Sequence, residues 1–210
     1  MMMERRAAPV DRDLVLAQLD FCREKVDALL PRFRNSFPAP SSEGLAYPAQ
    51  EENFDWTTSF YSGMLWLLWE HTGDKKYLDA LEPHLASFCR RVEEPGNVDT
   101  HDLGFLYSLS CGPAVLLRED GRARDCFLKA ADYLLARYIP KAGIIQAWGD
   151  LNDPANRGRM IIDCLLNLPL LYQASRLTGR GEYRAAAYSH ARQAQKYLVR
   201  QDDTTFHTFY

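Results

Sequence analysis

The chain has 210 residues, of which 47% are hydrophobic and 25% are charged, a composition typical of one globular domain. A formal net charge of −3 provides no basic field for nucleic acid or an anionic membrane, so neither is an expected partner. The first ten residues are too polar for a secretion signal, and no segment is apolar enough for a membrane span. Five scattered cysteines form no CxxC pair, so we expect a cytoplasmic protein without disulfides or a zinc knuckle.

Apolar residues recur at helical rather than strand spacing along most of the chain. Residues 1–11 are expected to be disordered. A first helix is expected over residues 12–34, ending near Pro31 or soon after it. Residues 35–52 are rich in proline, serine and glycine, and this composition predicts a loop.

Three helical hairpins are predicted in the rest of the chain. Their first helices start near residues 56, 103 and 160, and their second helices end near residues 92, 138 and 200. Each turn holds a glycine (Gly73, Gly121, Gly179), which we expect to cap the first helix in the left-handed conformation. These glycines lie 48 and 58 residues apart, a spacing typical of stacked helix pairs.

The two helices of each pair differ in character. The first is apolar nearly all round, which requires burial on every side, whereas the second carries one charged face. A ring of inner helices surrounded by amphipathic outer helices satisfies this pattern. The sequence therefore predicts an all-α fold, an (α/α) barrel or toroid of helical hairpins that is incomplete in this chain.

Unusual polar and aromatic residues recur at the start of the inner helices. Trp56, Asp102 and Asp163 each precede a turn by 15 to 18 residues, and we expect them to converge on one rim. His101 adjoins Asp102, Trp148 lies in the loop before the third inner helix, and His207 lies where a fourth would begin. Two carboxylates at one pocket can divide acid and base roles, and tryptophan faces can stack on a sugar ring.

Structural interpretations compete with these roles. Asp102 is also placed to be a helix N-cap, whereas Asp163 interrupts an apolar run, where a carboxylate needs a partner or a function. The residue type favours core packing for Trp56 and Trp148, and a lone histidine such as His101 or His207 is commonly structural. No role is assigned to the histidines expected near helix ends or on outer faces (His71, His84, His190). The arginines Arg90, Arg91, Arg122 and Arg124 are expected on the solvated outer surface.

At these same positions the sequence resembles the unsaturated glucuronyl hydrolases, glycoside hydrolase family 88. The resemblance spans roughly residues 50–210, and five motifs carry it in order: 56–66 (WTTSF and GMLW), 99–105 (DTHDLGF), 145–149 (IQAWG), 161–168 (IIDCLLNL) and 202–208 (DDTTFHT). It implies that residues 1–210 are one domain, the N-terminal half of an (α/α)6 barrel. Because further hairpins follow in the family, we expect the chain alone to be poorly active.

The resemblance also implies the chemistry. The substrate would be an unsaturated uronic-acid oligosaccharide released by a polysaccharide lyase, for example from a glycosaminoglycan. Asp163 would be the general acid/base that hydrates the C4–C5 double bond, and Asp102 would assist it. Trp56, His101, Trp148 and His207 would bind the sugar, and no metal or organic cofactor is implied.

Three other functions remain open at this point. An unsaturated rhamnogalacturonyl hydrolase would share fold and chemistry but act on a pectin-derived substrate. A helical-repeat scaffold or inactive sugar-binding fragment would make Asp163 dispensable. A sugar epimerase would need a histidine pair, which only His101 and His207 could supply.

Overall fold

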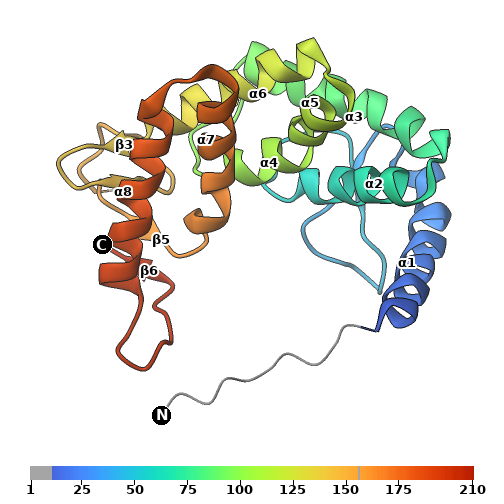
Figure 1. The fold of residues 1–210 in the computed structure, drawn as a ribbon, viewed down its shortest axis with the longest axis horizontal. Helices are drawn as coiled ribbons and strands as arrows, with labels where there is room; N and C mark the ends of the chain where they lie inside the picture. The colour runs from blue at the N-terminus through green and yellow to red at the C-terminus, as the bar shows by residue number, and fades with distance from the viewer. Residues whose placement is uncertain (1–10, 156) are drawn as a thin grey trace.

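The computed structural model describes residues 11–155 and 157–210, and the helices follow one another around an open arc (Figure 1). The expected disorder of residues 1–10 lies outside the described residues. Asp11, expected in the same segment, is instead the N-cap of the first helix, accepting hydrogen bonds from the backbone of Asp13 and Leu14. The helices are α1 (Arg12–Phe33), α2 (Thr58–Thr72), α3 (Lys75–Glu93), α4 (Leu103–Leu109), α5 (Cys111–Arg118), α6 (Gly121–Ala136), α7 (Cys164–Thr178) and α8 (Gly181–Leu198).

The three predicted hairpins are present and share one core. They are α2 with α3, α4 and α5 with α6, and α7 with α8, and α4 also packs between α2 and α7. Buried side chains from these helices and from α1 form one continuous hydrophobic cluster. This arrangement confirms the prediction of an all-α fold of helical hairpins.

The turns explain where the hairpins reverse. Gly73 and Gly179 adopt φ values of 70° and 76° as C-caps of α2 and α7, as predicted. The prediction is wrong for Gly121, which is the first residue of α6. Asp120 accepts a hydrogen bond from the Ala123 backbone N–H as the N-cap of α6, so the left-handed position falls on Glu119, at φ 53°.

The second inner helix is not continuous, contrary to the prediction. It divides at Ser110 into α4 and α5. Pro113 has no backbone N–H for the carbonyl of Leu109, and its ring would collide with that carbonyl in a regular helix. The indole Nε1–H of Trp66 donates to the Ser110 carbonyl at 2.9 Å, which satisfies one backbone group at the break.

Short strand pairs interrupt the connections, where only loops or helix were predicted. They are β1 (Phe37–Pro38) with β2 (Ala49–Gln50), β3 (Tyr138–Ile139) with β4 (Ile144–Ile145), and β5 (Met160–Ile161) with β6 (Thr208–Phe209), all antiparallel. The third inner helix therefore begins at Cys164 rather than near residue 160. Pairing with a segment almost 50 residues away decides the conformation of Met160 and Ile161.

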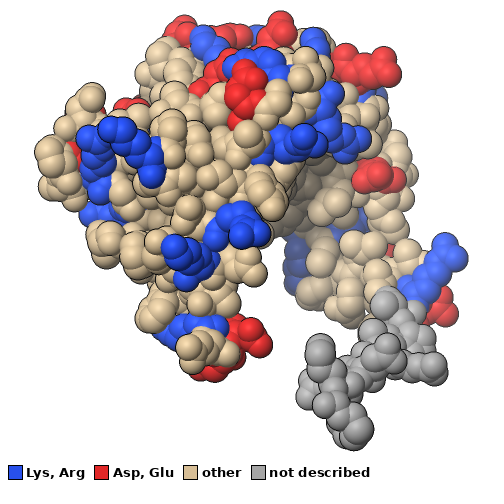
Figure 2. Space-filling model, turned by 60° about the vertical axis from the view of Figure 1, so that its left-hand side comes forward, with Lys and Arg blue, Asp and Glu red and all other residues tan. Residues whose placement is uncertain are grey.

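The inner helices α2, α5 and α7 carry apolar side chains on the face turned away from the outer helices. Leu67, Leu116 and Leu166 are each more than 60% exposed. Figure 2 shows a hollow inside the arc, with lysine and arginine side chains on parts of its border. None of the described helices combines the length and apolar character needed to cross a bilayer.

Candidate active site at the N-termini of two inner helices

A glycine and a buried asparagine bring α4 and α7 together. A Cβ atom on Gly104 would lie 2.2 Å from Asn167 Cα, so only glycine permits this approach. Asn167 Oδ1 accepts the backbone N–H of Phe105 at 2.6 Å, and its amide donates to the Asp163 carbonyl at 3.3 Å. The N-termini of the two helices, with Asp102 and Asp163, therefore lie side by side.

Both carboxylates face the same buried histidine. His101 Nε2 lies 3.3 Å from Asp102 Oδ1 and 3.6 Å from Asp163 Oδ1. The ring is almost fully buried, and the backbone N–H of His101 donates to the Ala147 carbonyl at 2.7 Å. The three ligand atoms lie within 4.8 Å of one another, so the group is also close enough to hold a cation.

Neither aspartate caps its helix, although each occupies the N-cap position. Asp102 and Asp163 make no side-chain cap hydrogen bond, in contrast to Asp74 and Asp120, which cap α3 and α6. Asp102 Oδ2 instead accepts a hydrogen bond from Thr100 Oγ1 at 2.7 Å. The capping interpretation of Asp102 is therefore right about position and wrong about the contact.

The two aspartates have different surroundings. Burial opposes ionisation of Asp102, but hydrogen bonds from His101 and Thr100 outweigh it, so the pKa of Asp102 lies below its usual value. Asp102 is thus held as an anion with 18% of its side chain exposed. The Asp163 side chain is 37% exposed, and its buried Oδ1 accepts no hydrogen bond from the described residues. One carboxylate is fixed, and the other is available to a ligand.

A pocket of about 420 Å³ opens beside Asp102, and Trp56 and Trp148 both line it. The two indoles are 46% and 42% exposed, so the interpretation that they fill the core is wrong. Trp56 packs against Phe105 with ring centroids 5.6 Å apart. The guanidinium of Arg159 lies 4.9 Å from the Trp148 ring centroid. These contacts leave part of each indole free to stack on a sugar ring.

His207 reaches the same rim through its backbone. Its carbonyl accepts the Ile162 N–H at 3.0 Å, one residue before Asp163, next to the β5–β6 pairing. Its side chain is exposed and makes no hydrogen bond or ion pair within the described part of the chain. The structure thus brings Trp56, His101, Asp102, Trp148 and Asp163 together and places His207 beside them, without a contact between the His101 and His207 rings.

Sequence reasoning missed the arginine that shapes one side of the pocket. Arg91 was expected on the surface but is only 6% exposed. Its guanidinium donates to the carbonyls of Phe54, Asp55 and Asn97 and to Asn53 Oδ1 at 3.0–3.2 Å. Arg91 follows the buried residues His84 and Phe88 at helical spacing, and this spacing was the available signal.

A second buried arginine holds the Trp148 loop. Arg137 Nε donates to the Gln146 carbonyl at 2.9 Å, and Nη2 donates to the Gly149 carbonyl at 3.0 Å. Burial lowers the pKa of Arg137, and the nearby Asp99 carboxylate partly offsets this decrease. No pattern in the sequence distinguishes this arginine from a surface residue at a helix end.

The remaining sequence predictions have mixed outcomes. Arg90, Arg122 and Arg124 are exposed as expected. His84 and His190 are fully buried rather than on outer faces: His84 Nδ1 bonds Ser62 Oγ at 3.0 Å, and His190 Nδ1 accepts the Ile145 N–H at 2.8 Å. His71 is exposed near the end of α2, and all five cysteines are free.

Comparison with known proteins places this geometry in a family. The sequence model described as Glycosyl Hydrolase Family 88 matches residues 30–208. Unsaturated glucuronyl hydrolase of Bacillus sp. (strain GL1) is 48% identical over 181 residues, covering 86% of this chain and 48% of that protein. Unsaturated chondroitin disaccharide hydrolase of Streptococcus pneumoniae is 40% identical over 192 residues, covering 91% and 48%.

A solved structure agrees with the described fold. The crystal structure of unsaturated glucuronyl hydrolase from Streptococcus agalactiae superimposes with a TM-score of 0.93 at 34% identity. The match covers 100% of this chain and 54% of that one. The chain therefore spans about half the length of the relatives it matches.

Proposed function

The chain belongs to glycosyl hydrolase family 88, and on this premise we propose that the whole protein hydrolyses unsaturated glucuronyl oligosaccharides. The relatives named above act, by their names, on unsaturated glucuronyl or chondroitin disaccharide substrates. The observation that carries the proposal is the pair of aspartates that occupy helix N-cap positions without capping and instead face His101.

We propose that the described residues form one domain, the N-terminal half of an (α/α)6 barrel. The relatives are about twice as long, and the exposed leucines of α2, α5 and α7 provide an apolar face for further inner helices to cover. The residues that line the pocket beside Asp102 would then form one wall of a more enclosed site.

In the proposed reaction Asp163 acts as the general acid/base. It protonates C4 of the unsaturated uronic acid and then takes a proton from the water that adds at C5. The product is a hemiketal, which opens and releases the remaining sugar. The partly exposed Asp163 carboxyl suits proton exchange with substrate and water, whereas the fixed, ionised Asp102 suits binding of hydroxyl groups and stabilisation of positive charge.

The surrounding residues are proposed to hold the sugar. Trp56 and Trp148 provide partly exposed ring faces, His101 orients both carboxylates, and His207 binds from the β5–β6 side. The mechanism requires no metal or organic cofactor. We expect no nucleic-acid or membrane partner, and the five free cysteines suit a reducing, cytoplasmic compartment.

The test follows absorbance of the C4–C5 double bond on incubation with an unsaturated chondroitin disaccharide. The protein should carry the hairpins that complete its relatives, and Asp163→Asn is compared with the exposed-surface variant Asp79→Asn. Loss of absorbance with the parent and Asp79→Asn, but a rate at least about 100-fold lower with Asp163→Asn, supports the proposal. Equal rates for the parent and both variants refute the role of Asp163. The assay is repeated with a pectin-derived unsaturated disaccharide. Loss of absorbance with that substrate alone selects the rhamnogalacturonyl alternative.

A further inference from the structure

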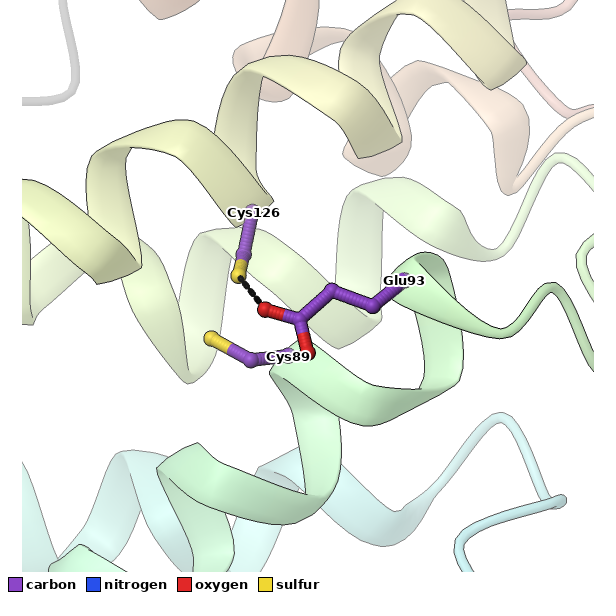
Figure 3. A group of neighbouring side chains, drawn as sticks. All are labelled: Cys89, Glu93 and Cys126. Atoms are coloured by element: carbon purple, nitrogen blue, oxygen red, sulfur yellow. Dashed lines mark hydrogen bonds between the residues drawn. The ribbon is translucent and has the colours of Figure 1, made fainter.

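A second cluster of metal-ligating side chains lies between α3 and α6, outside the proposed active site. It consists of Cys89 and Glu93 on α3 and Cys126 on α6, whose side chains point toward one another (Figure 3). One ligand atom from each residue lies within 4.8 Å of the other two. Cys126 Sγ also donates a hydrogen bond to Glu93 Oε1 at 3.8 Å.

The helices position this cluster without distortion. Cys89 and Glu93 are four residues apart and therefore share one face of α3, with Cys126 on the facing helix. Both thiols are almost fully buried, whereas the Glu93 side chain is 46% exposed. The cluster thus has a buried sulfur side and a solvent side through which an ion can enter.

We propose that Cys89, Cys126 and Glu93 form a binding site for a thiophilic divalent cation, with Zn²⁺ as the best match. Two thiolates and one carboxylate are among the ligands that Zn²⁺ takes in proteins, and water can supply a fourth. Hard cations such as Mg²⁺ prefer a set made of oxygen atoms alone. The bound ion would link the outer helices of two successive hairpins.

The cluster has space for a water molecule on its Cys89 side. A small cavity of about 80 Å³ adjoins Cys89 and is also lined by Asp120 and Arg122. Binding would displace the thiol protons, so affinity should rise with pH.

Arg122 gives the proposal a test that leaves the buried residues intact. Its Nη2 lies 3.2 Å from Glu93 Oε2, and both side chains are substantially exposed. The Arg122 guanidinium competes with a metal ion for the Glu93 carboxylate, and its positive charge repels the metal ion. Arg122→Gln should therefore strengthen metal binding by about 2- to 5-fold, as expected for an exposed charge pair.

The experiment measures Zn²⁺ bound per chain after dialysis and then titrates the protein with Cd²⁺. The ultraviolet absorption of Cd²⁺–thiolate bonds reports sulfur ligands and excludes binding at the thiol-free His101, Asp102 and Asp163 group. All proteins carry Cys22→Ser, because Cys22 is the exposed thiol. Cys164→Ser is the matched control, since Cys164 is buried and outside the cluster.

We expect one Zn²⁺ per chain and a thiolate band in the parent and in Cys164→Ser. Cys126→Ser should lower the affinity at least about 100-fold, and Glu93→Gln about 10-fold. Circular dichroism verifies that each variant is folded. The absence of a thiolate band in the parent, or an Arg122→Gln affinity no higher than that of the parent, would overturn the proposal.

Discussion

The contact between Gly104 and Asn167 makes a quantitative prediction, because it joins the two helices that carry the aspartates. In Gly104→Ala the new Cβ would lie 2.2 Å from Asn167 Cα and 2.3 Å from its carbonyl oxygen, so backbone must move. Such overpacking costs about 1–3 kcal/mol. Separating the helices also breaks the buried bond from Phe105 N–H to Asn167, which costs a further ~1–3 kcal/mol. The higher helix propensity of alanine offsets at most ~1 kcal/mol of this loss.

The free energy of unfolding of Gly104→Ala should therefore fall by about 1–6 kcal/mol, measured by urea denaturation followed by circular dichroism. Gly63→Ala is the matched control, since it lies inside α2 and its added Cβ would meet Leu109 Cβ at an ordinary 3.4 Å. We expect that variant to be neutral or slightly stabilised. If the two variants have the same stability, the close approach of α4 and α7 does not restrict residue 104 to glycine, and the reasoning is refuted.

Three further predictions concern a buried histidine, a buried arginine and two aspartates at helix N-cap positions. Burial lowers the pKa of His190 to about 4, so between pH 6.5 and 4 the unfolded chain binds a proton that the folded chain does not. Stability should fall by up to about 3 kcal/mol as pH drops through that window, and His190→Gln should lose this part of the pH dependence in urea titrations at pH 7 and 4.5. Arg91→Lys should lower the free energy of unfolding by about 2–4 kcal/mol, because lysine cannot reproduce a fork that bonds four oxygens, and unchanged stability would contradict this. Asp120→Ala should lower the free energy of unfolding by about 1 kcal/mol, because the N-cap hydrogen bond of α6 is lost. Asp163→Ala should change it by less than about 0.5 kcal/mol, because Asp163 makes no cap hydrogen bond. Equal losses in the two variants would mean that Asp163 does cap α7.

The features that the sequence predicted correctly are local ones. The hairpins follow from helical spacing of apolar residues, and two of the three reversals follow from glycines that adopt positive φ. The convergence of Asp102 and Asp163 also follows from local information, since each begins an inner helix and the hairpins repeat. A regular repeat turns similar positions along the chain into neighbours in space.

The features that it could not predict depend on distant contacts. Ile161 lies in a strand because Thr208 pairs with it, and no local pattern near residue 160 contains that information. Asn167 is a polar residue in the apolar first half of α7, and its role depends on the glycine that faces it from α4. Arg137 acts on backbone carbonyls, which every residue has, so its partners leave no trace in the sequence.

The described residues are sufficient to position the two aspartates but leave the pocket beside Asp102 open. The contacts that orient Asp102 and Asp163 come from Thr100, His101 and Asn167, all within this chain. The pocket beside Asp102 is open, and general acid/base catalysis on a vinyl ether benefits when bulk water is excluded. We therefore expect the isolated chain to keep the aspartate geometry but to turn over poorly, and the added hairpins to restore the rate. Turnover by the 210-residue chain equal to that of a full-length relative would show that these three hairpins suffice.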